Sequence, residues 1–393
     1  MACPLCSALS DPIRTELSTC SYAVLATCIQ SADRNSELPL PLFRIERNLV
    51  GTALKPGDVL RVYSSRDYQV GDKSLLLGIG AMPDTEWGPS APISRSAVAY
   101  IDEILSMLKQ EHKLDRPLPT PKPAEKADQR AVEPSAPQPV VDETLWLNFF
   151  WRHLESDDSW VRDDCFNAVA GISLEAMSQW VGTLKANDVT ARIENSATAM
   201  DHRRFYWVVL SLCGKQSERD FARRSIFRTL NRTEEERTDA VSDLDAAISC
   251  FIGLGGEEAL TEIETEILNH PGRRYSERCA AVSAIRVQAT EFKKLDRSRL
   301  CRSLALALND PDIADLVIPD LARQEDWSQI SRMMQLYRSA DKEHQYLRVP
   351  IVNYLRTCPL PEAAMALEEC RTTDPDAYRR ATILFPRLSP GGR

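Results

Sequence analysis

The 393-residue sequence has no long apolar run, and this absence excludes one class of protein. Its best apolar stretches, YAVLATCI from residue 22 and YWVVLSLC from residue 206, are well short of the roughly 18 residues that a membrane-spanning helix needs. Apolar residues make up 43% of the chain and charged residues 27%, which is typical of a soluble globular protein. We therefore expect no transmembrane segment.

Familiar catalytic and metal-binding motifs are missing too. The five histidines never stand three or four residues apart, as zinc ligands on one helix do, and no Gly-x-Ser-x-Gly nucleophile elbow occurs. The glycines of FIGLGG, residues 251–256, are followed by two glutamates, whereas a phosphate-binding loop needs lysine and serine or threonine. We interpret them as a helix C-cap and turn. The sequence favours a protein that is not an enzyme.

The chain also lacks an excess of positive charge. Its net charge of −9 argues against a surface that attracts nucleic acid. The short basic clusters stand among acidic residues, and we expect solvated helix faces there: Arg203-Arg204, Arg223-Arg224 and Arg273-Arg274.

The eleven cysteines are unevenly distributed. Seven are scattered through helical patterns, where a small buried side chain is expected. The other four crowd the N-terminal segment: Cys3, Cys6, Cys20 and Cys28. Disulfides that pin this segment to the following strands are the commonest outcome for such a group. A structural zinc site of four thiolates, a redox pair in the Cys3-Pro4-Leu5-Cys6 motif and free thiols are the alternatives.

The start of the chain leaves the compartment open. No basic region or apolar signal core follows Met1, which predicts a cytoplasmic protein if this start is genuine. If a signal peptide has been omitted, we expect an exported or cell-envelope protein.

Residues 1–110 have the pattern of a small β domain. Residues 22–29 are apolar on both faces and predict a central strand, whereas residues 42–50 alternate and predict a half-exposed one. After the Lys55-Pro56-Gly57-Asp58 turn, VLRVY and SLLLGIG predict further strands of an antiparallel barrel. Residues 94–109 have helical spacing and should pack on this domain.

Residues 111–143 are rich in proline and polar residues and predict a flexible linker. From 144 to 388 helical patterns recur every 30 to 45 residues, which predicts an all-α solenoid of the HEAT or armadillo kind. Within residues 346–385, two apolar helical stripes flank a proline turn. Neither stripe can be buried by such a pair alone, so similar neighbours are required.

An aromatic cluster begins the helical region, and it has two interpretations. Trp146, Phe149 and Phe150 share a helix face with Trp151 nearby, so the cluster either caps the first repeat against the β domain or forms a peptide-binding patch. Arg348 is a further candidate for an interaction residue. Since no catalytic constellation is found, we expect a protein or peptide partner on the concave face of the array, and no cofactor apart from the possible zinc.

The opening CPLCSALS, with ADLVIPDLARQEDWSQISRMMQLY and YLRVPIVNYLRTCPLPEA, resembles an uncharacterised bacterial family that joins a cysteine-bearing β domain to HEAT-like helices. This family has no assigned activity. FRIERNLVGTALKPGDVLRV and YQVGDKSLLLGIG are similar to the OB barrel of netrin-like metalloprotease inhibitors. That resemblance implies an alternative function in which Cys3, as a mature N-terminus, binds a protease zinc. The two residues between Cys3 and Cys6, instead of one, depart from the inhibitor pattern.

Overall fold

The computed structural model describes residues 5–6, 10–32, 40–52, 54–64, 66–111, 114, 143–233 and 243–384. Two compact units are found, Ser7–Ile172 and a second composed of Met1–Cys6 with Ser173–Arg393. The predicted linker lies almost entirely outside the described residues. The division follows Ile172, so the first helices of the predicted helical domain belong to the unit that contains the β-sheet.

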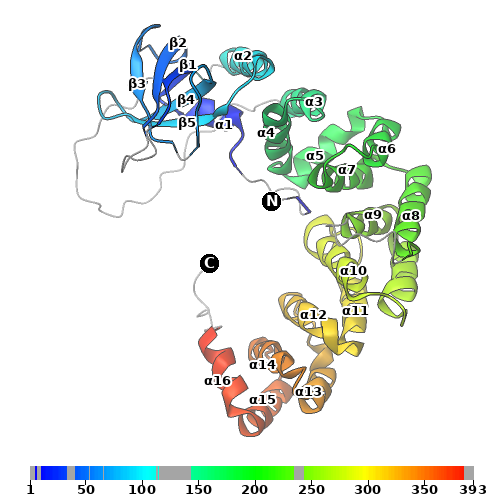
Figure 1. The fold of residues 1–393 in the computed structure, drawn as a ribbon. Coiled ribbons are helices and arrows are strands. Elements are labelled where there is room, and N and C mark those ends of the chain that lie inside the picture. The colour runs from blue at the N-terminus through cyan, green and yellow to red at the C-terminus, as the bar shows by residue number, and fades with distance from the viewer. Residues whose placement is uncertain are drawn as a thin grey trace. The chain divides into compact units, whose positions relative to one another are not determined.

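The first unit contains a five-stranded antiparallel sheet, curled into a half-barrel, with the order β3-β2-β1-β4-β5 (Figure 1). Its strands are β1 (Tyr22–Gln30), β2 (Leu42–Val50), β3 (Val59–Arg61), β4 (Lys73–Ile79) and β5 (Glu86–Pro92). The predicted central strand is confirmed as β1, which pairs with both β2 and β4. Its apolar character on both faces is the reason, because a strand covered on both sides needs no polar face.

Sequence patterns predicted four of these strands and missed β5. Gly88, Pro89 and Pro92 lower the strand propensity of this segment. Because β5 lies at the edge of the sheet, where one row of backbone groups needs no partner, proline is tolerated there.

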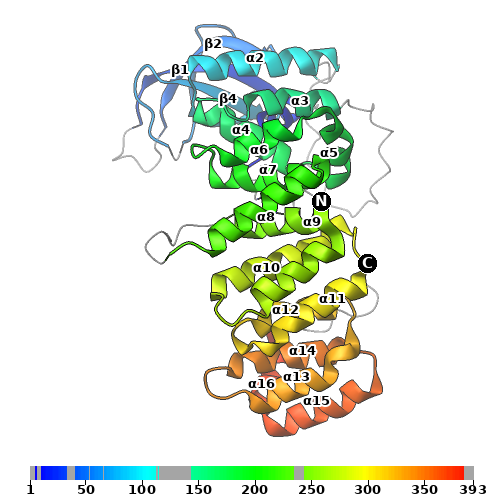
Figure 2. The ribbon, with the colours of Figure 1, turned by 90° about the vertical axis from the view of Figure 1, so that its right-hand side faces the viewer.

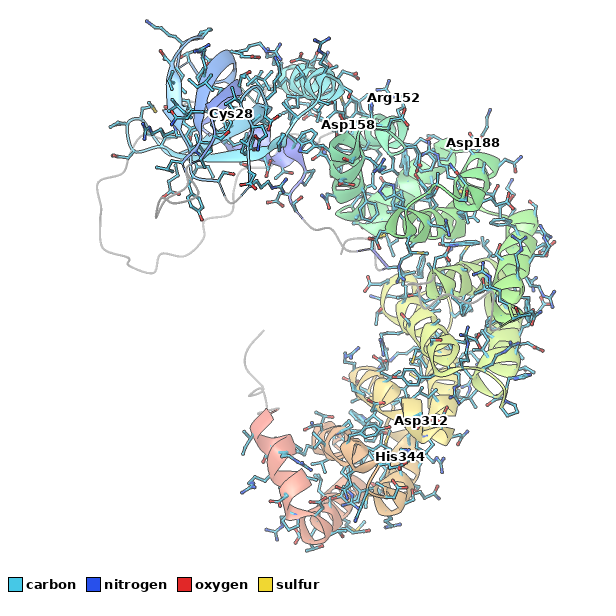
Figure 3. The ribbon with its side chains drawn as sticks, in the orientation of Figure 1. Cys28, Arg152, Asp158, Asp188, Asp312 and His344 are labelled. Carbon is cyan, nitrogen blue, oxygen red and sulfur yellow. The ribbon has the colours of Figure 1, made fainter. Side chains whose placement is uncertain are left out.

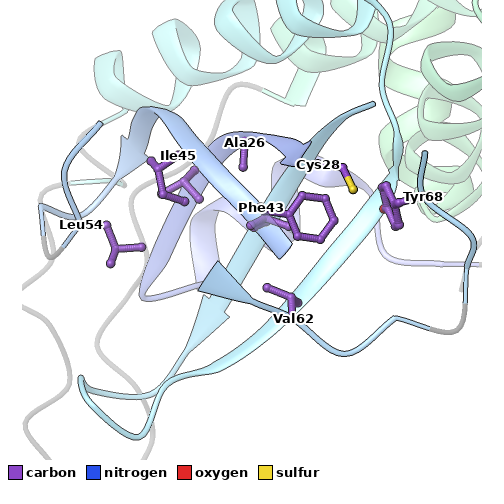
Figure 4. Close-up of a cluster of buried hydrophobic side chains, with 9 residues drawn as sticks. Ala26, Cys28, Phe43, Ile45, Leu54, Val62 and Tyr68 are labelled. Carbon is purple, nitrogen blue, oxygen red and sulfur yellow. The ribbon is translucent and has the colours of Figure 1, made fainter. Parts of the chain in front are cut away.

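The core of the half-barrel is formed by side chains from β1, β2 and β4 and from the loops around β3 (Figure 4). Phe43 meets Tyr68 edge to face, with 5.0 Å between ring centroids. The hydroxyls of Tyr68 and Ser74 lie 3.2 Å apart, so the polar end of the buried ring has a partner. Cys28 is fully buried in this core.

The described α-helices of the first unit are α1 (Ile13–Thr19), α2 (Arg95–Gln110), α3 (Glu143–His153) and α4 (Ser159–Ala170). The predicted helix at 94–109 is confirmed as α2, and the Ser94 hydroxyl caps it by accepting the Ala97 N–H. Arg47 of β2 forms an ion pair with Asp102 of α2 at 2.6 Å, which joins the helix to the sheet. Helix α2 also contacts α1 and α4.

The second unit is built from helices, as the sequence predicted. The described α-helices are α5 (Leu174–Trp180), α6 (Ala186–Glu194), α7 (Met200–Cys213), α8 (Gln216–Leu230), α9 (Leu244–Ile263), α10 (Tyr275–Val287), α11 (Arg297–Leu306), α12 (Pro311–Arg323), α13 (Ile330–Ser339), α14 (Arg348–Thr357), α15 (Pro361–Thr373) and α16 (Pro375–Leu384). Short 3-10 or π-helical turns lie at Val181–Thr183, Glu264–Leu268, Gln288–Phe292, Ala307–Asn309, Trp327–Gln329 and Gln345–Leu347.

These helices contact neighbours that are close in the sequence (Figure 2). Both α7 and α8 contact α9, and α9 contacts α10. Contacts then continue from α10 to α12, from α12 to α14 and from α14 to α16. The predicted pair of helices within residues 346–385 is confirmed as α14 and α15.

The helix end predicted at the glycines of residues 251–256 is found at Gly256. Its φ of 62° and ψ of −141° are not helical, and the span of α9 consists of two helical segments that meet at this kink. Among the described residues, no helix is both long and apolar enough to cross a membrane.

Candidate interaction surfaces

The N-terminal cysteines do not form the predicted four-cysteine group in the described part of the chain. Cys6 is disulfide-bonded, and Cys3 lies outside the described residues. Cys20 and Cys28 carry free thiols, so the prediction that they take part in disulfides is wrong for this structure. The reason is local: the Cys20 Sγ lies 3.6 Å from the Leu17 carbonyl oxygen, and Cys28 points into the barrel core, 3.4 Å from the Gln30 carbonyl oxygen.

The environment of these two thiols does not favour thiolate chemistry. Burial raises the pKa of Cys20 to about 11 and also raises the pKa of Cys28. A thiolate is the form that attacks a disulfide or binds a metal, so both side chains are held in the less reactive form. No group of three or more potential metal ligands was found among the described residues.

The aromatic cluster of α3 is internal. Trp146, Phe149 and Phe150 are at most 1% exposed, so these three rings do not form the peptide-binding patch that was one of the two predictions. Tyr100 of α2 stacks on Phe149 at 5.3 Å between ring centroids. The cluster thus packs α3 against α2, because three large rings on one helix face remove more apolar surface from water than a polar interface could. Trp151 is half-buried beside them.

A groove of about 450 Å³ lies beside this cluster, between α2 and α3. Met107, Leu145 and Phe149 supply its apolar lining, and Arg152 lies at its side (Figure 3). The Arg152 guanidinium is 5.8 Å from the centre of the Phe149 ring. Only the edge of the predicted aromatic patch is therefore available to a ligand.

A buried polar cluster links three helices of the first unit. The Asp164 carboxylate of α4 accepts hydrogen bonds from the Ile13 N–H and the Tyr100 hydroxyl, both at 2.7 Å. The Cys165 Sγ lies 3.3 Å from the same hydroxyl. Burial raises the pKa of Asp164 to about 6, although the two donors partly offset this effect. All these groups have partners inside the protein, which indicates a structural role.

Arg348, predicted as an interaction residue, is held by internal contacts. Its guanidinium bonds to Asp374 at 2.7 Å and to the Ala340 carbonyl at 3.2 Å, and it lies 5.3 Å from the centre of the Tyr337 ring. The side chains of Arg348 and Asp374 are 18% and 19% exposed. This arginine therefore joins α14 to the start of α16.

Similar arginine–carboxylate pairs recur along the second unit. Each of three pairs joins a helix to the next but one: Arg204 to Asp245 at 2.7 Å, Arg286 to Asp320 at 2.6 Å and Arg338 to Glu369 at 2.6 Å. The Arg204 Nε also donates to the Leu5 carbonyl at 2.9 Å. Each pair therefore ties together two helices that also contact each other.

His344 is clamped between two carboxylates near the surface (Figure 3). Its Nδ1 lies 2.9 Å from Asp341 and its Nε2 lies 3.4 Å from Asp312. The hydrogen bond to Asp341 is the main cause that raises the pKa of His344. These contacts link the start of α12 to the turn before α14.

A further pocket, of about 280 Å³, lies among α6, α7, α8 and α9. Three arginines line it: Arg203, Arg228 and Arg232. Trp207 and Phe221 supply an apolar side, with their rings stacked at 5.4 Å between centroids. The neighbouring basic clusters were predicted to be solvated helix faces. The four-residue spacing of Arg228 and Arg232 was the signal in the sequence that could have indicated this pocket.

No known protein family, curated protein or solved structure matches this chain. The family resemblances of the sequence therefore remain predictions.

Proposed function

We propose that the protein is a noncatalytic scaffold whose helical unit forms a HEAT-like array and binds another polypeptide. The observation that supports this most is the succession of contacts from α9 to α10, α12, α14 and α16. In an array of this kind, neighbouring repeats present a continuous surface that is longer than any one helix. Such a surface suits an extended polypeptide better than a small molecule.

The repeated ion pairs support the same proposal. A binding surface gains affinity when its side chains are fixed before the ligand arrives, because less conformational entropy is then lost on binding. Pairs such as Arg286 with Asp320 and Arg348 with Asp374 fix neighbouring helices in one arrangement. We expect the partner to bind the concave face of the array.

The curled sheet supports an OB-like first unit, and the netrin-like inhibitor is the alternative function. That alternative requires a free Cys3 amine at a protease zinc. Leu5, two residues later, is buried, and its carbonyl accepts a hydrogen bond from Arg204. This contact holds Leu5 against α7, and a chain end that entered a protease would have to release it. The disulfide of Cys6 opposes the zinc alternative at the CPLC motif, because zinc binds a thiolate. It does not oppose the redox alternative, since a redox pair is a disulfide in its oxidised state.

A random-peptide display library, selected on the full-length chain, tests the proposed function. We expect enriched peptides that bind with one-to-one stoichiometry in calorimetry. If repeated selections enrich no peptide, or if the natively produced protein turns over a substrate and a single polar substitution abolishes that turnover, the proposal fails.

A further inference from the structure

We infer that the pocket among α6, α7, α8 and α9 binds an acidic peptide segment, in which carboxylates flank an apolar side chain. This inference rests on the proposed function and adds the chemistry of the partner. The pocket lies wholly within the second unit, and its geometry divides into a cationic rim and an apolar side.

The cationic rim consists of arginines that are not used for packing. Helix α8 carries Arg219 and Arg223, which form ion pairs with Glu258 and Glu262 of α9 at 2.9 and 2.6 Å. Arg228, in the last turn of α8, is exposed and lines the pocket instead.

Arg232, two residues beyond the end of α8, also lines the pocket and is exposed. Among the described residues, no ion pair involves Arg228 or Arg232. These two guanidinium groups are therefore available to an acidic ligand.

Arg203, which also lines the pocket, supplies a second observation. One of its Nη atoms donates to the Thr198 carbonyl at 3.2 Å. Its Nε is buried and has no hydrogen-bond partner among the described residues. A buried donor without a partner costs free energy, and a ligand carboxylate that reached it would remove that cost.

The apolar side and the two acids of the pocket narrow the class of ligand. Trp207 and Phe221 offer stacked rings to an apolar side chain. Glu194 and Asp243 also line the pocket, and the Asp243 carboxylate accepts a hydrogen bond from the Trp207 indole at 2.8 Å.

These two carboxylates would repel the closely spaced phosphates of a nucleic acid. A peptide can instead place single carboxylates beside the arginines and direct an apolar residue to the rings. Charge complementarity therefore favours an acidic, partly apolar peptide.

Fluorescence anisotropy with the full-length chain tests this inference. The probe is a labelled octapeptide in which glutamate and leucine alternate. We expect Arg228→Glu to weaken its binding about tenfold or more, since a charge-assisted hydrogen bond contributes about 1.5–3 kcal/mol. Arg224→Glu is the matched control, because it reverses the same charge on the same helix outside the pocket lining. We expect it to weaken binding less than about threefold, as a screened surface charge does.

Four outcomes would overturn the inference: no binding of the probe, equal losses in the two variants, equal binding of a lysine–leucine octapeptide, or displacement of the probe by an oligothymidine at equal concentration. Circular dichroism must show that both variants remain folded. If the anisotropy experiment fails but the display library yields binding peptides, only the acidic-peptide inference is overturned. If the library yields no binders, the proposed scaffold function is overturned as well.

Discussion

Asp164 is a buried carboxylate whose protonation is coupled to folding. Its pKa in the folded chain, about 6, lies above the ordinary value of 3.8 because burial penalises the charged form. Between these two values the folded chain keeps a proton that the unfolded chain has lost. The stabilisation is therefore complete below pH 3.8 and is lost as the pH rises through 6.

Asp164→Asn should remove this pH dependence. We compare the free energy of unfolding of the wild type with that of the variant. We expect the difference, wild type minus variant, to fall by about 3 kcal/mol between pH 4 and pH 7. Urea unfolding at four pH values in this range measures the difference. Asp163→Asn, which changes an exposed neighbour of the same charge, is the control and should parallel the wild type. If the unfolding free energy of Asp164→Asn depended on pH as that of the wild type does, the coupling of Asp164 to folding would be contradicted.

The cysteine assignments lead to a second prediction at this scale. Iodoacetamide should label Cys20 and Cys28 in unfolded, unreduced protein, whereas Cys6 should be labelled only after reduction. In the folded protein at pH 8, Cys20 should react slowly, because its pKa of about 11 leaves roughly one thiolate in a thousand. Peptide mapping by mass spectrometry gives each answer. A peptide that contains a Cys20–Cys28 disulfide would refute the assignment.

At the residue scale, the sequence could least predict which charged side chains are free to contact a ligand. Arg348 and Arg228 both stand in amphipathic helices, yet Arg348 is fixed by Asp374 whereas Arg228 lines a pocket. The partner of each arginine is set by a helix that lies elsewhere in the sequence. Spacing within one helix cannot reveal it.

At the scale of elements, Gly256 is the predicted helix end, and a second helical segment of α9 follows it. Its φ of 62° and ψ of −141° lie in a region that is nearly restricted to glycine. No atom lies within 4 Å of the position that a Cβ would occupy there. A side chain would therefore meet backbone strain and no steric clash.

Gly256→Ala should destabilise the protein by about 1–3 kcal/mol through this strain. Gly182→Ala is the control, since a Cβ there also meets nothing within 4 Å and its φ is not positive. We expect the control to be neutral or slightly stabilising, because alanine lowers the entropy of the unfolded chain. Chemical unfolding followed by circular dichroism compares the two. Equal effects would show that the kink does not constrain the helix.

Most elements followed from local patterns, and the exceptions have physical causes. β2, α2, α14 and α15 were predicted because their apolar residues recur at the period of the element, and β1 because a short run is apolar on both faces. β5 was missed because its prolines lower the strand propensity, although proline is tolerated in an edge strand. The aromatic residues of α3 were ambiguous, since the same face could meet Tyr100 or solvent.

At the scale of the whole molecule, the division into two units differs from the one that composition suggested. The Pro-rich segment predicted a boundary at 111–143, but α3 and α4 belong to the unit that contains the sheet. Burial of Trp146, Phe149 and Phe150 against α2 accounts for this difference. Apolar contacts between distant segments, and not the composition of the connecting chain, set the limits of a compact unit.

The charge of the molecule is also unevenly distributed. The chain carries a net charge of −9, yet arginines gather along α8 and around its pocket. On a protein of negative net charge, a local cationic pocket attracts a short acidic segment more than a long acidic polymer, which also meets the remaining negative charge. We expect binding of the glutamate–leucine peptide to weaken as salt is raised.

Hydrogen–deuterium exchange of the full-length chain, with and without the tightest peptide from the display library, tests whether the helical unit binds the peptide. We expect slower exchange in the second unit, centred on α7, α8 and α9, and no change in the strands of the first unit. Protection confined to the β-sheet, with the helices unaffected, would contradict the claim that the helical array is the binding surface.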